Sequence, residues 1–352
     1  MPGFFEHAGG EEMGTILVTG GTGFIGSHTC VELLQQGYSV VVVDNLSNSN
    51  IGVLDRIKKI TGKEVVFYQL DLLDKTGLDF VFSRHSINSV IHFAGLKSVS
   101  ESVQIPLLYY YNNLISTLIL MEVMAKYSVF DFVFSSSATV YGGNNPIPYV
   151  EHFPLNSTTP YGRSKVMIEQ FLQDAFVSNP RWNMSILRYF NPTGAHQSGF
   201  IGEDPDGMPN NLMPFITQVA VGKREKLNVF GNDYSTRDGT GVRDYLHVVD
   251  LALGHIKALE KLASQKVNSI EVYNLGSGKG SSVLDVVHAF EKACGQRIAY
   301  NIMPRRDGDI SEFYADPTKA RQQLNWQAKL SLDHMCRDAW NWQHKNPNGY
   351  CE

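Results

Sequence analysis

The sequence TILVTGGTGFIGSH, residues 15–28, decides the fold of this chain. An apolar run at 15–19 leads directly into a glycine-rich turn and then into a helical pattern that extends to about residue 36. Gly20 and Gly23 let the backbone turn tightly and approach a pyrophosphate, and Gly26 lets the helix pack against the strand. The helix N-terminus offers free N–H groups and a partial positive charge to phosphates. This context favours a dinucleotide site over an ordinary tight turn between a strand and a helix.

The rest of the first half repeats the alternation of strand and helix. Its expected strands are apolar throughout, as parallel strands buried on both faces are, and helical patterns separate them. Strands are expected at 39–43, 65–70, 89–93, 131–135 and 184–189, and the clearest helices at 107–126 and 161–177. We therefore predict an α/β fold, with a doubly wound (Rossmann-type) parallel sheet and a smaller C-terminal α/β substrate lobe.

The composition of the sequence changes after residue 190. Residues 191–245 are rich in Gly, Pro, Asn and Asp, and further elements are expected at 248–262, 271–275, 283–293 and 332–344. We divide the chain into an extension or cloning scar (1–13), a nucleotide-binding domain (14–190) and a substrate-binding lobe (191–352). The boundary is soft, because the later strand at 270–275 can rejoin the main sheet.

Composition limits the partners and the location of the protein. The 352-residue chain has a net charge of −5, whereas nucleic-acid binders normally carry a basic excess. No apolar run reaches the ~18 residues of a membrane span, and the first 13 residues lack the basic and apolar regions of a secretory signal. The four cysteines are scattered, which favours free thiols over a disulfide or zinc framework. We expect a soluble cytoplasmic protein with no metal site and no nucleic-acid or membrane partner.

Asp44 indicates which dinucleotide binds. It ends the second expected strand, 18 residues after Gly26. A carboxylate there accepts hydrogen bonds from the adenosine ribose hydroxyls and repels a 2′-phosphate, so it favours NAD over NADP. The sequence Asp-Asn-Leu-Ser-Asn that starts at residue 44 is also typical of a turn, so Asp44 alone fits a capping role equally well. Together with the glycines, the NAD interpretation is favoured.

Tyr161-Gly162-Arg163-Ser164-Lys165 is the candidate catalytic motif. Four residues apart on a helix, Tyr161 and Lys165 share one face. A free phenol has a pKa of ~10, and a nearby ammonium is expected to lower it so that the phenol accepts a proton from a sugar hydroxyl. Ser137 ends the preceding strand region and offers a second hydroxyl to the substrate. An exposed tyrosine with a solvated lysine is the alternative interpretation.

These motifs resemble the extended short-chain dehydrogenase/reductase superfamily, and within it the UDP-glucose 4-epimerase (UDP-galactose 4-epimerase) family. The resemblance extends from about residue 14 to the end of the chain. The runs with this resemblance are TGGTGFIGSH (19–28), IHFAGLKSVSESV (91–103), FSSSATVYG (134–142), LRYFNPTGAH (187–196), PNNLMP (209–214) and DGTGVRDY (238–245).

The resemblance implies roles for individual residues. The implied catalytic residues are Ser137, Tyr161 and Lys165. The implied NAD-binding residues are Gly20, Gly23, Phe24, Ile25, Gly26, Asp44, Asn45, Leu46, Asn48, Ser49, Asp71, Leu72, Phe93, Ala94, Gly95, Lys97, Asn112, Tyr161, Lys165 and Phe190. The implied UDP-sugar-binding residues are Ser137, Asn191, Asn211, Leu212, Asn228, Phe230, Arg243, Arg306, Asp309 and Phe313. Arginine forks suit a diphosphate, although any single arginine also fits a surface ion pair.

The resemblance also implies the reaction and the assembly. It implies an isomerase of galactose metabolism that interconverts UDP-glucose and UDP-galactose through a 4-keto sugar, with NAD regenerated in each cycle. It implies a homodimer that pairs through helices 107–126 and 161–177. Phe313 is expected to lie beside the sugar's 2-substituent and to disfavour N-acetylated sugars, unless it only packs in the core of the lobe.

Two other functions compete with epimerisation. A nucleotide-sugar 4,6-dehydratase needs an acid and a base after the catalytic serine, but Ala138 and Thr139 stand there. A non-catalytic NAD-binding scaffold would tolerate the loss of Tyr161 or Lys165, and both are present.

Overall fold

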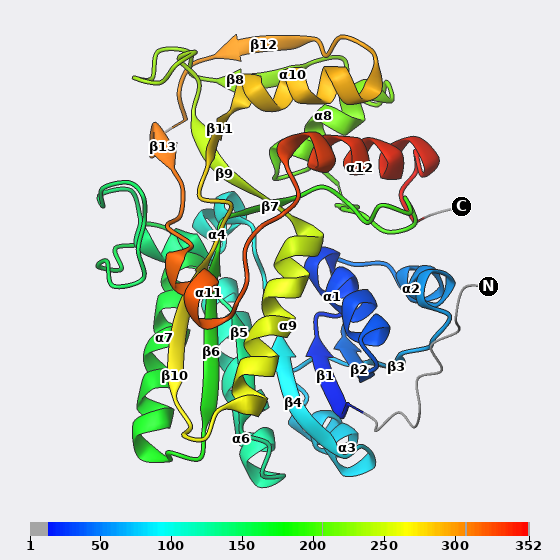
Figure 1. Ribbon diagram of the computed structural model, residues 1–352, viewed down its shortest axis with the longest axis vertical. Helices are drawn as coiled ribbons and strands as arrows, with labels where there is room; N and C mark the ends of the chain where they lie inside the picture. Colours follow the sequence, from blue (N-terminus) through cyan, green and yellow to red (C-terminus); the bar gives the residue numbers. More distant parts are fainter. Residues whose placement is uncertain (1–12, 206, 307, 351–352) are drawn as a thin grey trace, which may run out of the picture.

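The centre of the molecule is a sheet of seven parallel strands (Figure 1). The computed structural model describes residues 13–205, 207–306 and 308–350, so residues 1–12 of the expected extension and Cys351 lie outside it. The strands are β1 (Thr15–Thr19), β2 (Ser39–Asp44), β3 (Val66–Gln69), β4 (Ile87–His92), β5 (Asp131–Ser135), β6 (Asn183–Tyr189) and β10 (Ile270–Leu275). They lie in the order β10-β6-β5-β4-β1-β2-β3, and every neighbouring pair is parallel.

Helices cover both faces of this sheet. Ile16 and Val18 pack toward one layer of helices, and Leu17 between them packs toward the other. This burial on both faces explains why the strands are apolar throughout. The first layer consists of α1 (Phe24–Gln35), α2 (Val53–Thr61), α9 (Val248–Ser264) and α11 (Thr318–Gln323). The second layer includes α3 (Lys75–Arg84), α6 (Ser116–Lys126) and α7 (Pro160–Ser178). The short helices α4 (Val99–Gln104) and α5 (Pro106–Tyr110) precede α6 in the chain.

The chain leaves the middle of the sheet in two directions. From β1 it winds through β2 to β3 at one edge, and from β4 it winds through β5 and β6 toward the other. The carboxyl ends of β1 and β4 therefore border the point where the strand order reverses, which is where open α/β sheets bind ligands. The predicted fold class, a doubly wound parallel sheet, is confirmed.

A smaller lobe lies beyond the carboxyl ends of the strands, at the top of Figure 1. Within it β9 pairs with β7, β11 and β13, and β8 pairs with β12. Ile216, Phe290 and Met335 belong to a separate core in this lobe. Its elements are β7 (Asn191–Thr193), α8 (Leu212–Ala220), β8 (Leu227–Phe230), β9 (Val242–His247), β11 (Gly280–Ser282), α10 (Val283–Cys294), β12 (Tyr300–Met303), β13 (Glu312–Phe313) and α12 (Leu332–Lys345).

Two later segments return to the main sheet. β10 pairs with β6 along its whole length, and Leu251, Ile256 and Leu259 of α9 join the core that α1 covers. The chain therefore crosses between the sheet and the lobe several times, and segments from both line the space between them.

The expected long elements are found within a few residues of their predicted ends, with one exception. The helix expected at 107–126 is interrupted after α5 by a π-helical turn at Tyr111–Ile115, before α6 begins. The short helices and strands were not predicted, because short elements depend on tertiary packing more than on local propensity. Within the part of the chain that the structure describes, no helix is long and apolar enough to cross a membrane.

Candidate active site

A cavity of about 650 Å³ opens at the carboxyl ends of the central strands. One wall is formed by the loops that follow β1, β2, β3 and β4, and another by residues 202–205 and Tyr350. All of the predicted NAD-binding residues except Leu46 and Phe190 line it. Its size lies within the ~300–1,000 Å³ typical of ligand pockets.

The glycine-rich turn brings α1 into close contact with the sheet. Gly20 has a φ of +70°, and a Cβ there would lie 2.7 Å from the Ala94 nitrogen. A Cβ on Gly26 would lie 2.1 Å from the Gly20 oxygen. Gly23 is the N-cap of α1 and provides no side-chain cap. The N-terminus of α1 therefore meets the cavity without a side chain in between, as a bound pyrophosphate requires.

Asp44 both shapes the turn after β2 and lines the cavity. Its carboxylate accepts hydrogen bonds from the backbone nitrogens of Thr22 (3.1 Å) and Leu46 (2.9 Å) and from Ser49 Oγ (3.2 Å). Leu46 has a φ of +59° and belongs to this turn rather than to the cavity wall. The capping role considered for Asp44 is thus present, and it is compatible with a ligand beside the same carboxylate.

The candidate catalytic groups come together where α7 begins. Thr159 caps the helix, Pro160 occupies its first turn, and Tyr161 follows with 6 % of its surface exposed. A Cβ on Gly162 would lie 1.9 Å from Ser157 Oγ and 3.1 Å from the Thr139 oxygen. This glycine therefore lets α7 approach the turn after β5 closely enough for Ser137 to hydrogen bond to Tyr161.

Lys165 lies one turn further along α7, in the same buried region. Its Nζ donates to the Ser135 carbonyl at 2.8 Å and lies 4.7 Å above the Phe134 ring. Burial lowers the pKa of Lys165 to about 8, while the carboxylate of Glu169 acts in the opposite direction. The ammonium therefore remains charged at neutral pH.

The pKa of Tyr161 is not lowered as the sequence predicted. Burial raises the pKa of Tyr161 above its usual value, and the hydrogen bond with Ser137 opposes that rise only in part. The prediction considered charge alone, whereas desolvation dominates for a phenol this deeply enclosed.

The π-helical turn positions two neighbouring asparagines, Asn112 and Asn113. The sequence pattern predicted a role only for Asn112. Asn112 lines the cavity, whereas the buried Asn113 links three segments. Asn113 accepts from Leu96 N at 2.8 Å and donates to Leu96 O at 3.0 Å and to Ser164 Oγ at 3.2 Å. Since Ser164 precedes Lys165, this turn ties the loop after β4 to the catalytic helix. A π-turn inside a helix often marks such a site.

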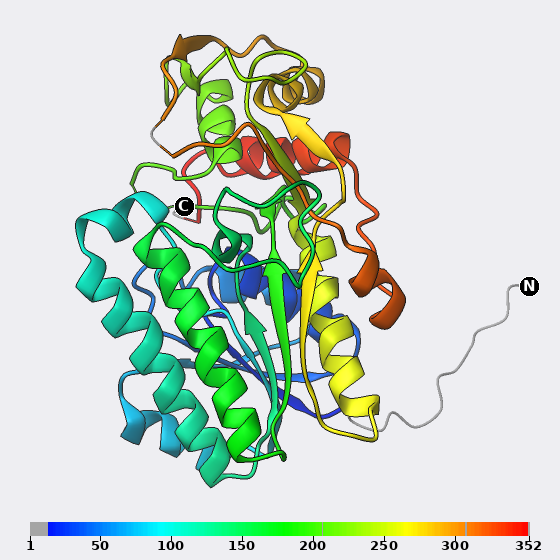
Figure 2. The ribbon, with the colours of Figure 1, turned by 90° about the vertical axis from the view of Figure 1, so that its left-hand side faces the viewer.

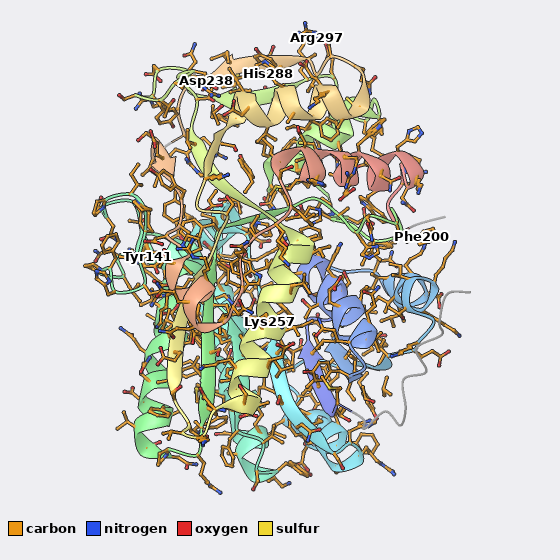
Figure 3. All side chains as sticks on the ribbon, viewed as in Figure 1. Tyr141, Phe200, Asp238, Lys257, His288 and Arg297 are labelled. Atoms are coloured by element: carbon orange, nitrogen blue, oxygen red, sulfur yellow. The ribbon has the colours of Figure 1, made fainter. Side chains whose placement is uncertain are left out.

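A buried ion pair beneath the site was missed by sequence reasoning. Glu169, on α7, accepts from Arg188 Nη2 at 2.6 Å and from Ser136 Oγ at 2.5 Å. Arg188 also donates to Tyr141 Oη at 3.0 Å, and Tyr141, labelled in Figure 3, ends the 3₁₀ turn that follows Ser137. The pair thus anchors the chain on both sides of Ser137. The available signal was a single charged residue in the buried strand β6.

The predicted UDP-sugar residues gather in the upper lobe, beside the cavity. Arg243 Nη2 and Arg306 Nε lie 3.4 and 2.9 Å from the carboxylate of Asp309. Phe313 is adjacent to Arg243 in the β13–β9 register, and its ring centroid lies 4.9 Å from that of Phe190. This contact joins the predicted substrate residues to the predicted cofactor residues.

A second junction lies at the lower side of the lobe. Asn211 is the N-cap of α8 and Leu212 is the first residue of that helix. Asn211 Nδ2 donates at 2.6 Å to Glu203 Oε1, which also lies 3.7 Å from Lys97 Nζ. The remaining members of the set lie on short strands: Asn191 on β7, and Asn228 and Phe230 on β8.

Sequence reasoning missed the wall that the upper lobe contributes to the cavity. The missed lining residues from that lobe are Gly202, Glu203, Asp204, Pro205, Met208, Asn210 and Tyr350. Their local sequence has no cofactor-binding pattern, and only the fold brings the end of the chain back to the cavity.

Comparison with known proteins assigns the family. The family model described as GDP-mannose 4,6 dehydratase matches residues 17–339. A UDP-glucose 4-epimerase from Bacillus subtilis is 59 % identical over 335 residues, which are 95 % of this chain and 98 % of that protein.

Solved structures of similar proteins agree with this result. A UDP-glucose 4-epimerase from Bifidobacterium longum, in complex with NAD+ and UDP, superposes with a TM-score of 0.91 at 52 % identity and covers 95 % of this chain and 99 % of its own. A UDP-Glc/GlcNAc 4-epimerase from Campylobacter jejuni has a TM-score of 0.82 at 37 % identity, with 94 % and 99 % covered.

Replacing Arg188 with Met tests the buried ion pair. The substitution leaves the Glu169 carboxylate buried without its cation, so we expect the free energy of unfolding to fall by about 3–5 kcal/mol. The measurement is urea denaturation with NAD present at a fixed, saturating concentration.

The double variant Arg188→Met, Glu169→Gln is the matched control for that measurement. The double variant removes both charges, and the amide can keep a hydrogen bond to Ser136, so most of the stability should return. A loss below ~1 kcal/mol in the single variant would contradict the role assigned to the pair.

Proposed function

The chain belongs to the family of UDP-glucose 4-epimerases, and from that premise we propose how its own residues catalyse the reaction. The protein is an NAD-dependent isomerase that interconverts UDP-glucose and UDP-galactose. The single observation that supports our residue assignment best is the meeting of Tyr161, Lys165 and Ser137 beside a glycine-lined cavity. The dehydratase alternative is not favoured, because Ala138 is apolar and Thr139 donates to Ser137 Oγ at 2.9 Å rather than supplying a carboxyl group.

We assign NAD to the cavity beneath the upper lobe. The close approach at Gly20 and Gly26 supports this assignment, since a side chain at Gly20 would collide with the backbone of the loop after β4 and one at Gly26 with the backbone of the glycine-rich turn. The N-terminus of α1 is suited to the pyrophosphate, and Asp44 to the adenosine ribose. Bound NAD supplies the acceptor and the donor of the C4 hydride.

Tyr161 is the group that we assign to proton transfer at the 4-hydroxyl of the sugar. The proton passes to the phenolate oxygen as the sugar becomes a 4-keto compound, and the same oxygen returns it after the sugar has turned over. Ser137 shares a hydrogen bond with that oxygen. Burial raises the pKa of Tyr161. We propose that the ammonium of Lys165, one helical turn away on α7, stabilises the phenolate as it forms and so opposes that rise.

We propose that Arg243 and Arg306 bind the diphosphate of the UDP-sugar. Both guanidinium groups contact the single carboxylate of Asp309, so the cluster keeps a net positive charge. Guanidinium forks match phosphate oxygens in geometry. Asn191, Asn211, Leu212, Asn228 and Phe230 complete the proposed site around the nucleotide.

We also propose that the two ligands bind mainly to different regions of the chain. Residues 14–190 supply most of the cofactor site and residues 191–352 most of the sugar-nucleotide site, and the later segments α9 and β10 support the first region. The thiols of Cys30, Cys294 and Cys336 are free. Free thiols support a reducing compartment, and we place the protein in the cytoplasm.

A second copy of the chain is the proposed partner of an apolar helical face. Leu107 and Tyr111 are 81 % and 60 % exposed at the start of the α5–α6 helix, and Val177 on the neighbouring α7 is 81 % exposed. Figure 2 views these helices side by side. Such a face matches itself about a two-fold axis, which supports an isologous homodimer.

The first test replaces Tyr161 with Phe. The variant should retain NAD and its fold but lose turnover of UDP-galactose by about 10²–10⁴-fold, the typical contribution of a general base. A coupled assay of UDP-glucose formation without added NAD measures it. Tyr300→Phe, on the exposed strand β12, is the control for loss of a tyrosine hydroxyl. Turnover by Tyr161→Phe at the wild-type rate would exclude Tyr161 as the base.

The second test concerns the range of sugars. If the Phe313 ring lies beside the 2-substituent, an N-acetyl group overpacks the site and lowers kcat/KM by about 5- to 150-fold relative to the hydroxyl. Phe313→Cys should therefore raise the ratio of kcat/KM for UDP-N-acetylgalactosamine to that for UDP-galactose.

Phe153→Cys is the matched control for this substitution. Phe153 packs on the same Tyr149 ring that Phe313 contacts, so its loss loosens the cluster alone. Equal rates of the wild-type protein on both sugars would show that the ring does not limit the site.

The third test concerns assembly. Sedimentation of the wild-type protein at micromolar concentration should give a species of about twice the 39.3 kDa chain mass. Leu107→Arg places a charge in the proposed interface and should shift the protein toward the single chain. Ile302→Arg, at an exposed position on strand β12 of the upper lobe, should leave the mass unchanged. A wild-type protein that sediments only as a single chain would refute the homodimer.

A further inference from the structure

The outer wall of the cofactor cavity is a short segment of the upper lobe. Residues 202–205 face the glycine-rich turn across the cavity, and we call them the outer wall. Gly202 pairs with Ala195, so the wall continues a loop that begins at the end of β7. A ligand as long as a dinucleotide has to lie between this wall and the sheet.

The outer wall and the loop that leads to it are fastened to α12 and the segment after it. Side chains from this region donate to a series of loop and wall carbonyls. The bonds are Asn341 to Gln197 (2.9 Å), Lys345 to Ser198 (3.0 Å), Asn346 to Gly199 (2.9 Å) and Trp342 to Glu203 (3.3 Å). The wall has little regular structure of its own, so its position depends on these bonds.

Tyr350 makes the last of these attachments, at the cavity itself. Its hydroxyl accepts from Gly202 N and donates to Gly202 O, each at 3.2 Å. Its backbone N–H donates to Asp204 Oδ2 at 2.9 Å, and its ring centroid lies 4.7 Å from that of Trp342. Gly349 has a φ of +73°, and a Cβ there would lie 2.1 Å from the Asp204 carboxylate oxygens.

The position of Tyr350 identifies the end of the cavity that it closes. Asp44, whose carboxylate suits the adenosine ribose, is followed by the turn that leads to Gly52 and α2. A Cβ on Gly52 would lie 3.7 Å from the backbone carbonyl oxygen of Tyr350 and 3.9 Å from its Cβ. A second contact joins α2 to the loop that leads to the outer wall: Nζ of Lys59 lies 4.1 Å from the centre of the Phe200 ring (Figure 3). Tyr161 and Lys165 line the other end.

We propose that Tyr350 retains the cofactor, because its side chain holds the outer wall against the adenosine end of the cavity and so limits the rate at which NAD leaves. The inference rests on the assignment of NAD to this cavity. Release requires the wall to part from the loop after β2 and from α2. Tyr350 bonds to the wall at Gly202 and Asp204, and its side chain packs against the core to which Val53 and Ile57 of α2 belong. Burial also raises the pKa of Tyr350, so the phenol keeps its proton and its donor bond to Gly202 throughout the neutral range.

The experiment measures release of NAD from the purified holoenzyme. Each protein is freed of unbound nucleotide by gel filtration, and released NAD is converted to fluorescent NADH by excess alcohol dehydrogenase and ethanol. Tyr350→Phe loses the two hydroxyl bonds but keeps the ring, so release should accelerate about 2- to 10-fold. Tyr350→Ala also loses the packing against Trp342, and release should accelerate at least ~10-fold.

Two matched controls separate retention from general loosening. Tyr300→Phe removes a hydroxyl on β12, and Trp340→Ala removes a ring from another side of α12, where it packs against Phe290. Both should release NAD at the wild-type rate. Should Tyr350→Ala fail to fold, Tyr350→Phe removes both hydroxyl bonds, Asp204→Ala removes the acceptor of the Tyr350 backbone N–H, and both should accelerate release.

The outcomes distinguish this inference from the cofactor assignment. A wild-type protein that holds NAD, with every Tyr350 and Asp204 variant releasing it at the wild-type rate, would overturn the retaining role alone. The retaining role would also be overturned if Trp340→Ala released NAD as fast as Tyr350→Ala does. A wild-type protein that neither contains nor takes up NAD would overturn the cofactor assignment and this inference together.

Discussion

The approach of α1 to the central sheet is the constraint on which the rest of the structure depends. A Cβ at Gly26 would lie 2.1 Å from the Gly20 oxygen, so no other residue fits there without displacing the helix. The approach directs the helix N-terminus into the space where the strand order reverses. Every other wall of the cavity is arranged around that point: the loops after β2, β3 and β4 on the sheet side, and the outer wall opposite.

The proposed catalytic groups depend on a second close approach, between α7 and the turn after β5. Gly162 permits it, and the Glu169–Arg188 pair holds the strand end and the turn in place underneath. Burial in this region has opposite effects on the two titrating groups: it lowers the pKa of Lys165 and raises that of Tyr161. The same desolvation therefore keeps the phenol protonated until a neighbouring charge favours its ionised form.

The upper lobe contributes to both proposed ligand sites. Its short strands present the arginines that we assign to the diphosphate, and its loops form the outer wall of the cofactor cavity. Glu203 lies at the junction, since it accepts from Asn211 and lies near Lys97. The lobe is thus a structural part of the proposed cofactor site as well as of the proposed sugar-nucleotide site.

The sequence by itself determined the doubly wound sheet, the dinucleotide turn and the candidate catalytic residues, because each is encoded in a few neighbouring positions. Strand burial produces long apolar runs, the turn needs glycines at short spacing, and Tyr161 and Lys165 are one helical turn apart. The π-helical turn at Tyr111–Ile115, the ion pair of Glu169 with Arg188 and the contact of Tyr350 with the outer wall were decided only by the tertiary structure. Glu169 and Arg188 are 19 residues apart, and Tyr350 and Gly202 are 148 apart. No local pattern specifies such partners, because they meet only after the hydrophobic cores have brought distant segments together.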